Sequence, residues 1–111
     1  MYVSSGGVAS YTIVNSGGYL NILNGGTTID TTVNGGRLYV LSGGTANSTT
    51  VNLSGRMYVY ESGLLNSVTI YSSGSLNLDS GASYYSGTIT SMAGAFVTID
   101  PGAVALSPPT T

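Results

Sequence analysis

The sequence predicts an all-β chain whose short repeats wind a parallel β-helix, or solenoid, of about six rungs with roughly 19 residues in each. Three observations predict it. Two kinds of marker residue recur at a common spacing, short stretches alternate apolar and polar residues, and Gly, Ser, Thr and Asn fill most of the other positions. Glycine and β-branched residues interrupt every window in which a helical apolar stripe could form, which favours strands over helices.

Glycine marks the phase of the repeat, in steps of roughly 19 residues. The glycine series is expected to run through Gly7, Gly26, Gly44, Gly63, Ala82 (beside Gly81) and Gly102. An aliphatic marker lies half a period out of step and precedes a polar turn. It is expected to consist of Val14, Val33, Val51, Ile70 and Ile89. Two independent markers with the same spacing argue against a chance pattern.

The first strand of each repeat alternates apolar and polar side chains, which is typical of a strand with one buried face. Its copies are expected at residues 19–23, 37–41, 56–60, 75–78 and 95–99. The buried face is expected to carry Leu20, Leu38, Met57, Leu76 and Phe96, together with Ile22, Val40, Val59 and Leu78. The outward face is expected to carry Asn21, Tyr39, Tyr58 and Asn77.

A second strand in each repeat is rich in β-branched residues, which suit a pleated sheet, and residues 49–51 are its clearest copy. Glycine pairs between the strands supply the positive φ that sharp corners need. Asn15, Asn34 and Asn52 are expected to share a column at one corner. Stacked amides there could form hydrogen bonds along the axis, as in other ladders of identical residues.

Stacking explains why such strands coil. One repeat has too few apolar side chains to close a core, whereas equal repeats stacked about 4.8 Å apart build columns of like residues and parallel sheets. A β-sandwich of hairpins is the competing fold, but hairpin sheets do not require matching residue types at a fixed period. A leucine-rich horseshoe fits less well, because its internal Leu/Asn spacing is not met.

Composition excludes several classes of function. Charged residues make up 5% of the chain, with Lys+Arg 2 and Asp+Glu 4, so two cations are available to neutralise phosphates and nucleic acid is a poor partner. The absence of cysteine and histidine removes thiolate zinc sites, Cys nucleophiles and the usual general base. No apolar run is long enough for a membrane-spanning helix. No cofactor, no metal site and no enzymatic activity are therefore expected.

The chain is expected to divide into β-helix repeats over residues 1–94 and a last partial rung with a proline-rich C-terminal cap or the start of a linker over residues 95–111. Proline cannot donate a ladder hydrogen bond, so the tail is not expected to extend the sheet far. The sequence begins in mid-pattern, which indicates a fragment of a longer protein.

One repeat pattern resembles a known family. A Val-Asn-Ser-Gly-Gly turn occurs at residues 14–18, and an apolar strand with the Ser-Gly-Gly turn after it occurs at residues 38–44. The Ser-, Thr- and Asn-rich strand at residues 45–52 completes the pattern. This pattern resembles the AIDA-type stalk repeats of bacterial autotransporter adhesins. The resemblance implies a right-handed parallel β-helix in a secreted passenger domain, displayed on the surface of a Gram-negative-type cell by an outer-membrane translocator. It also implies a role in adhesion, autoaggregation or biofilm formation.

The same resemblance implies a possible modification. Some family members carry O-linked heptose on passenger serines, added by a glycosyltransferase. Matching turn motifs make Ser5, Ser16, Ser42 and Ser73 the candidate positions in this chain.

Three carboxylates precede the phase-marking glycines of successive rungs, and stacking could bring them close together. They are Glu61, Asp79 and Asp100. An acid/base pair of a glycosidase or a Ca²⁺ site is one interpretation. Ordinary solvated turn carboxylates are the favoured one, since Asp100 precedes a proline and Arg37 and Arg56 are the chain's two cations.

A possible contact surface lies on the outward face of the first strands. Arg37 and Arg56 are expected to share a column, continued by Ser75 and Ala95, and the tyrosines beside them are Tyr39, Tyr58 and Tyr60. Tyr and Arg are favoured at interfaces and against sugars. The competing interpretation is a ladder of stacked tyrosines that stabilises neighbouring strands. Tyr84 and Tyr85 form a second exposed candidate.

Three functions remain open on these grounds. The leading one is a structural or adhesive surface segment that acts through contacts between rods or with host or bacterial surface glycans and proteins. The alternative is a carbohydrate-active or carbohydrate-binding β-helix module, and the third is a passive spacer.

Overall fold

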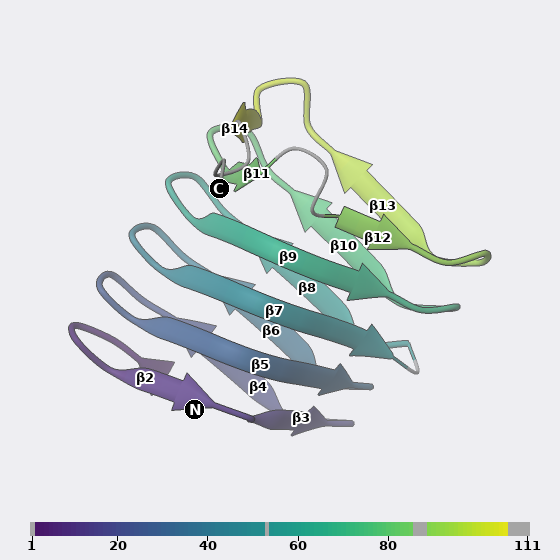
Figure 1. Ribbon diagram of the computed structural model, residues 1–111, viewed down its shortest axis with the longest axis horizontal. Coiled ribbons are helices and arrows are strands. Elements are labelled where there is room, and N and C mark those ends of the chain that lie inside the picture. The colour runs from purple at the N-terminus through teal and green to yellow at the C-terminus, as the bar shows by residue number, and fades with distance from the viewer. Residues whose placement is uncertain (1, 53, 86–88, 107–111) are drawn as a thin grey trace, which may run out of the picture.

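The structure is a computed structural model that describes residues 2–52, 54–85 and 89–106. Strands and turns account for these residues, and none of them forms a helix long and apolar enough to cross a membrane. The chain coils upward with one strand stacked on the next, so that each turn lies directly on the turn below (Figure 1). The parallel β-helix is confirmed.

The first sheet contains one short strand from each turn. Among the described residues it has six parallel strands, in the order β1 (Tyr2–Val3), β4 (Tyr19–Ile22), β6 (Arg37–Val40), β8 (Arg56–Val59), β10 (Ser75–Leu78) and β13 (Phe96–Ile99). These strands correspond to the expected six rungs, and the coil between the first and the last of them completes about five turns.

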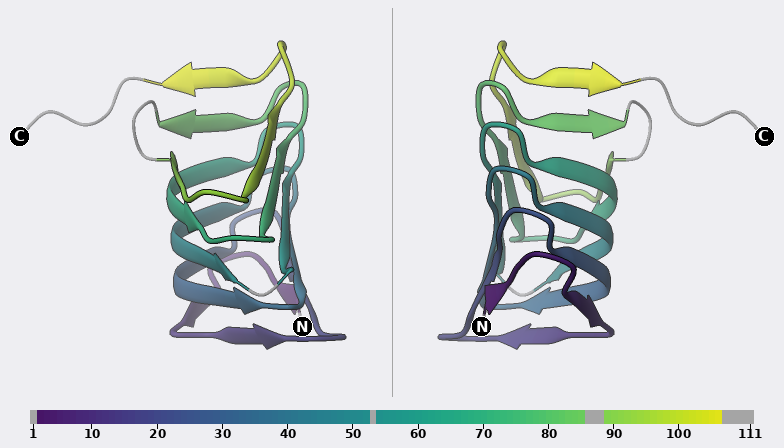
Figure 2. Two further views of the ribbon diagram at one scale, coloured as in Figure 1. Left: turned by 90° about the vertical axis from the view of Figure 1, so that its right-hand side faces the viewer. Right: turned by 90° about the vertical axis from the view of Figure 1, so that its left-hand side faces the viewer.

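The second sheet lies on the opposite side of the coil from the first, as the side views show (Figure 2). Its main path in the described chain is β14 (Val104–Leu106), β11 (Ser83–Tyr85), β9 (Leu64–Ile70), β7 (Thr45–Asn52), β5 (Thr27–Asn34) and β2 (Val8–Ser10). Two further strands pair beside this path, β12 (Ile89–Ser91) with β9 and β3 (Ile13–Asn15) with β5. All these pairings are parallel, and the central strands are longer than the sequence predicts.

A kink in the middle of each long strand bends the second sheet into two faces. The residues at the kink lie in one column and have left-handed backbone conformations: Tyr11 (φ 54), Asp30 (φ 55), Ser48 (φ 52) and Ser67 (φ 66). The kink residues of the long strands do not pair with one another in the sheet. After the kink, the alternation of buried and outward side chains begins again with a buried threonine or valine. This third corner does not use glycine, so a search for glycine turns cannot find it.

Glycines at the two other corners allow close stacking of the turns. A Cβ atom added to Gly44 would lie 2.7 Å from the carbonyl oxygen of Ile22 in the turn below. At the other corner, a Cβ on Gly55 would lie 2.7 Å from the carbonyl oxygen of Val33. Contacts this short exclude a side chain, so both glycine columns are set by backbone packing.

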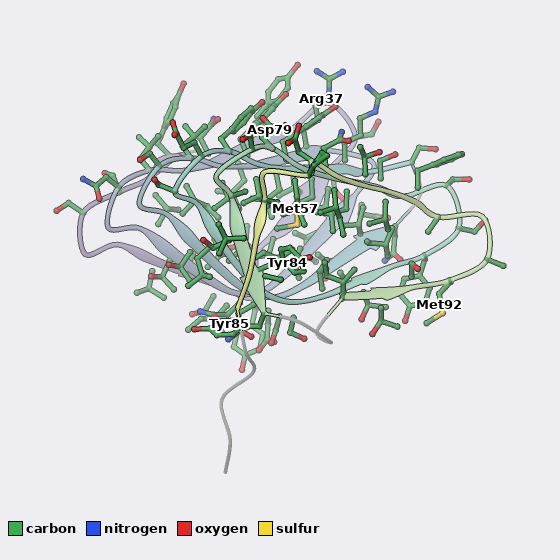
Figure 3. All side chains as sticks on the ribbon, turned by 90° about the horizontal axis from the view of Figure 1, so that it is seen from above. Arg37, Met57, Asp79, Tyr84, Tyr85 and Met92 are labelled. Atoms are coloured by element: carbon green, nitrogen blue, oxygen red, sulfur yellow. The ribbon has the colours of Figure 1, made fainter. Side chains whose placement is uncertain are left out.

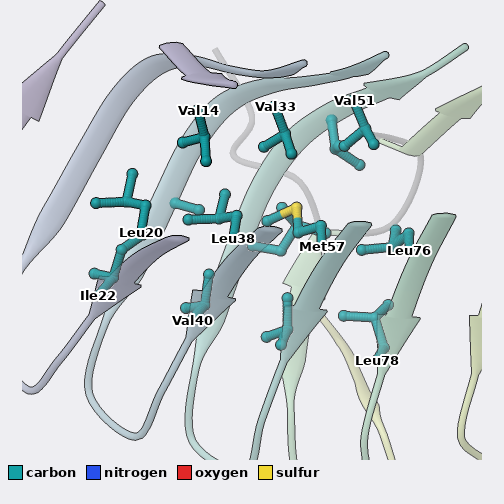
Figure 4. Close-up of a cluster of buried hydrophobic side chains, with 14 of the residues drawn as sticks. Val14, Leu20, Ile22, Val33, Leu38, Val40, Val51, Met57, Leu76 and Leu78 are labelled. Atoms are coloured by element: carbon teal, nitrogen blue, oxygen red, sulfur yellow. The ribbon is translucent and has the colours of Figure 1, made fainter. Parts of the chain in front are cut away.

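The core lies between the two sheets and consists of columns of aliphatic side chains (Figure 4). Leu20, Leu38, Met57 and Leu76 stack as predicted and are almost wholly buried. The valine column through Val33 and Val51 faces them from the second sheet (Figure 4). Burying one such side chain completely contributes about 1.5–3 kcal/mol, so these columns are the main stabilising feature.

The last turn departs from the predicted register. Phe96 was expected above Leu76 on the buried face, but it pairs with Ser75 and is 65% exposed. Val97 takes the position above Leu76. The arginine column therefore continues through Phe96, and the prediction that Ala95 continues it is wrong.

Both marker series end differently from the prediction. Ile89 pairs with Val68, while the position above Ile70 is held by Ser91. The glycine series also shifts by one residue. The amide of Val104 donates to the carbonyl of Ala82, which places Ala103 rather than Gly102 above Ala82.

Two additional residues in the last turn explain the shift. Tyr84 pairs with Leu65, 19 positions earlier, whereas Ile89 pairs with Val68, 21 positions earlier. Between these two pairs the turn below has Asn66 and Ser67, and the last turn has two residues more. The marker series shows only part of this change, since Gly63 and Ala82 are 19 positions apart whereas Ala82 and Gly102 are 20 apart.

Asparagines stack at two places. Asn15, Asn34 and Asn52 share a column as predicted. The amide hydrogen bond between turns is found elsewhere, where Asn66 Nδ2 donates to Asn47 Oδ1 at 3.2 Å on the second sheet.

Three threonines introduce hydroxyl groups into the core. The side chains of Thr28, Thr31 and Thr49 are buried, and among the described residues their hydroxyl oxygens have no hydrogen-bond partner. Thr31 and Thr49 share a column with Val68, so the next turn fills the same position with an aliphatic side chain. At equal burial, the core of the lower turns therefore contributes less to the free energy of unfolding than the core of the upper turns.

Candidate functional site

Four tyrosines gather on the outward face of the first sheet and stack on one another. Tyr39 and Tyr58 lie one above the other with ring centroids 5.3 Å apart and an angle of 11° between ring planes. Tyr19 extends the stack at 6.2 Å from Tyr39. Tyr60 stands beside both central rings, at 6.3 Å and 6.4 Å. We name this cluster the tyrosine ladder.

Alternation of side chains explains how the strands position the ladder. Residues 37, 39 and 41 face outward while residues 38 and 40 are buried, and the turn above repeats the pattern with residues 56, 58 and 60. Repeats of nearly equal length then place Tyr58 directly over Tyr39. The sequence prediction missed Tyr19, although its outward position in the column of Arg37 was a usable signal.

Arg37 is held against the ladder. Its guanidinium carbon lies 5.8 Å from the centroid of the Tyr19 ring, within the range of a cation–π contact. A side-chain hydrogen bond with Tyr39, followed by electrostatic interactions with Tyr39 and Tyr19, raises the pKa of Arg37 further above its ordinary value. This arginine is therefore a fixed positive charge at the start of its strand.

Tyr60 occupies the other edge of the face. Burial raises the pKa of its phenol above the usual value, and nearby Tyr39, Asp79 and Tyr58 raise it further. Tyr60 therefore stays neutral at physiological pH and offers a hydroxyl group that can donate a hydrogen bond.

The structure brings together the five residues predicted as a contact surface: Arg37, Tyr39, Arg56, Tyr58 and Tyr60. The rings of Tyr39 and Tyr58 stack with their flat faces against each other, as the ladder interpretation predicted. What the surface can present outward is mainly ring edges, hydroxyl groups and the two guanidinium groups. Its role as a contact surface stays a prediction.

The second aromatic candidate is placed differently. Tyr84, expected to be exposed, pairs with Leu65 and packs partly buried against the core, because its position on the strand faces inward. Tyr85 is the outward neighbour, on the opposite side of the molecule from Arg37 (Figure 3). The prediction of an exposed pair is therefore wrong for Tyr84.

The carboxylates fall into two neighbouring columns at the ends of the first-sheet strands. The amide of Asp79 donates to the carbonyl of Val59, which puts Asp79 above Tyr60, and Asp100 follows in the next turn. Glu61 lies one residue beyond Tyr60, at the side of Gly81. Thus Asp79 and Asp100 share a column and Glu61 does not.

These carboxylates form no evident site for chemistry. Asp100 Oδ1 accepts a hydrogen bond from the amide of Gly102 at 2.8 Å, as in an ordinary Asx turn. In the described part of the chain no three His, Cys, Asp or Glu side chains are grouped so as to hold a metal ion. The carbohydrate-active alternative stays a prediction.

The four candidate serines are exposed at two corners. Ser5 and Ser42 lie where the first sheet turns into the second. Ser16 and Ser73 lie at the corner that leads back to the first sheet, where Ser73 has a positive φ of 72°. Their accessibility is compatible with modification, which stays a prediction.

Comparison with known proteins supports the predicted resemblance. The sequence model of the family described as "Adhesin of bacterial autotransporter system, probable stalk" matches residues 33–74. This segment covers the most regular turns, from the end of β5 to the corner after β9. The resemblance to AIDA-type stalk repeats is confirmed.

A solved structure shows the same architecture. The chain is 30% identical to a TibC-catalyzed hyper-glycosylated TibA fragment, with a TM-score of 0.58 over 95% of this chain. The chain spans 52% of the length of that fragment. No curated protein matches the sequence. The chain is therefore similar to an adhesin stalk family over its central turns and to the TibA fragment over most of its length.

Proposed function

We propose that this chain is an adhesive rod segment of a secreted bacterial surface protein, part of a passenger that an outer-membrane translocator displays outside the cell. The match to AIDA-type stalk repeats and the likeness to the TibA fragment support this assignment. The segment acts in adhesion, autoaggregation or biofilm formation through its surface, and it catalyses no reaction.

The observation that carries the proposal is the regular stacking of outward columns. Parallel pairing holds turn after turn in register from β2 to β9, so each outward position becomes a straight column. Columns of Thr, Asn and Ser on the second sheet offer many hydroxyl and amide groups with almost no charge. Two such rods, or a rod and a surface glycan, can form many weak hydrogen bonds with little repulsion.

Self-association of the purified chain tests the proposal. Sedimentation between micromolar and millimolar concentrations should show a rise in mean mass, and cells that display the chain should clump and settle. A monomer over the whole range, together with no clumping on display, would count against an adhesive role and would favour a passive spacer.

We also propose that the exposed corner serines Ser5, Ser16, Ser42 and Ser73 accept O-linked sugars from a glycosyltransferase. The supporting observations are their exposure and the hyper-glycosylated state of the TibA fragment. Mass spectrometry of the chain after coexpression with such an enzyme should find added hexose- or heptose-sized masses on these residues. Unmodified peptides at all four corners would contradict the assignment.

A further inference from the structure

The charges of the chain are unevenly placed. Both cations, Arg37 and Arg56, stand at the starts of first-sheet strands β6 and β8. Three of the four carboxylates, Glu61, Asp79 and Asp100, follow the ends of strands in the same sheet. The outward face of the first sheet therefore has a positive edge, where its strands begin, and a negative edge, where they end. Tyr39 and Tyr58 lie between the two edges, and Arg37 and Asp79 mark them in Figure 3.

These edges are symmetric about the central outward column. The arginine column lies two residues before the column of Tyr39 and Tyr58, and the column of Tyr60 and Asp79 lies two residues after it. At about 3.3 Å per residue, each edge is about 7 Å from the centre. A half-turn about a line parallel to the solenoid axis therefore exchanges the two edges.

From this arrangement we propose that the first-sheet face binds the same face of a second copy of this chain, with the two rods parallel and related by a two-fold axis along the rods. The inference rests on the proposed adhesive function and specifies its partner and orientation. In this pairing Arg56 lies opposite Tyr60 of the second copy. Asp79 of that copy is one turn away, about 4.8 Å along the axis, and Glu61 is adjacent.

Charge selects the parallel orientation over the antiparallel one. Antiparallel rods packed face to face about a perpendicular two-fold axis would place the arginine edge against the arginine edge and the acidic edge against the acidic edge. Like charges facing each other are unfavourable, whereas the parallel pairing forms two equivalent sets of opposite charges. In both cases the tyrosine ladders meet at the centre, where Tyr is favoured in interfaces.

The size of the face predicts a weak contact. Five residues along the strand by four stacking intervals give about 17 Å by about 19 Å, which buries less than the roughly 1,200 Å² of a stable interface. A dissociation constant near the millimolar range is therefore expected for this chain. Many copies side by side on one cell would strengthen the contact through high effective concentration.

Chemical cross-linking can read out both the face and the orientation, because the chain has no cysteine of its own. Asn21 and Asn77 share the central outward column at opposite ends of the ladder. Asn21→Cys and Asn77→Cys are treated separately with a bis-maleimide that spans about 10 Å, the usual distance between packed sheets. Thr50→Cys, which faces outward from the second sheet, is the matched control.

Parallel pairing predicts that Asn21→Cys alone and Asn77→Cys alone each give covalent dimers at about 1 mM protein, in several times the yield of Thr50→Cys. A mixture of the two variants, one labelled with heavy isotopes, should give mainly same-residue dimers. Mainly mixed dimers would show antiparallel rods and overturn the proposal. Dimers in sedimentation without cross-links at either residue would overturn it too, but would leave the proposed function standing.

Charge reversal tests the electrostatic argument. Arg56→Asp or Asp79→Arg alone should lower the cross-linking yield at Asn21→Cys about threefold to tenfold, since each variant brings like charges together. A one-to-one mixture of the two variants restores opposite charges at both contacts and should recover the yield. Equal yields in all samples would contradict the proposal. A parent chain that stays monomeric in every assay would remove the proposed function as well.

Discussion

The central turns and the last turn differ although they use the same strand positions. Leu78 and Ile99 occupy one core column, but Leu78 is 1% exposed and Ile99 is 42% exposed. Leu78 has a turn above and a turn below, whereas β13 is the outermost strand of the described sheet. This difference shows that the turns above and below a residue bury its side chain in a solenoid. A residue's contribution to stability therefore depends on its place in the stack.

The largest expected effect follows directly from this comparison. Leu78→Ala removes buried methyl groups between two turns and should lower the free energy of unfolding by about 2–5 kcal/mol. Ile99→Ala, in the same column, should cost less than about 1 kcal/mol because its side chain is already in contact with solvent. Urea unfolding followed by circular dichroism measures both. Equal losses would show that the last turn is as well packed as the central ones.

The kink residues offer a second way to separate the two regions. Ser67 holds a left-handed conformation with a φ of 66°, which a β-branched residue adopts only under strain. Ser67→Val should therefore destabilise the chain by about 1–3 kcal/mol. Ser67→Gly should be neutral or slightly stabilising, since glycine adopts this conformation readily.

The control for the kink is Thr69→Val on the same strand, which should change stability by about 0.5 kcal/mol or less. If Ser67→Val were as harmless as Thr69→Val, the strand would not be kinked at this residue.

Sequence reasoning succeeded where the repeats are regular and failed where they are not. The columns through Leu38 and Met57 and through Val33 and Val51 were predictable because alternation and spacing are both visible in the sequence. The register of Phe96 was not predictable, because two extra residues between Tyr84 and Ile89 shift the last turn.

The candidate surface was predictable only in part. Alternation places Tyr39 and Tyr58 outward in adjacent turns, so their meeting could be expected. Ring stacking, and the contact of Arg37 with Tyr19, depend on side-chain rotamers, which the sequence does not specify. The kink column was missed because its residues are Tyr, Asp and Ser rather than glycine.

Removing a buried hydroxyl group tests how much the core threonines lower the stability of the lower turns. Thr49→Val keeps the shape of the side chain and removes a hydroxyl that has no hydrogen-bond partner among the described residues, so it should stabilise the chain by about 1 kcal/mol. Thr50→Val, at the neighbouring outward position, should change stability by less than about 0.5 kcal/mol. Thermal unfolding of both variants is the measurement, and a loss of stability in Thr49→Val would show that this hydroxyl forms a stabilising hydrogen bond in solution.

The smallest expected effect is on alkaline stability. The raised pKa of Tyr60 means that its neutral form is favoured in the folded chain. Its contribution to stability is therefore fully present below the unfolded pKa of about 10 and is lost as pH rises through the higher folded pKa. Tyr60→Phe should flatten the alkaline loss of stability, with Tyr71→Phe at an exposed corner as the matched control. Identical pH profiles for the parent and Tyr60→Phe would contradict this assignment.

The central claim, that the turns stack in parallel register, is tested most directly by nuclear Overhauser contacts in solution. Parallel stacking predicts contacts between the rings of Tyr39 and Tyr58 and between the backbones of Leu76 and Val97. Each described strand should also contact the strand one full turn away. Close pairs of α-protons between consecutive strands, which are typical of antiparallel hairpins, would contradict it.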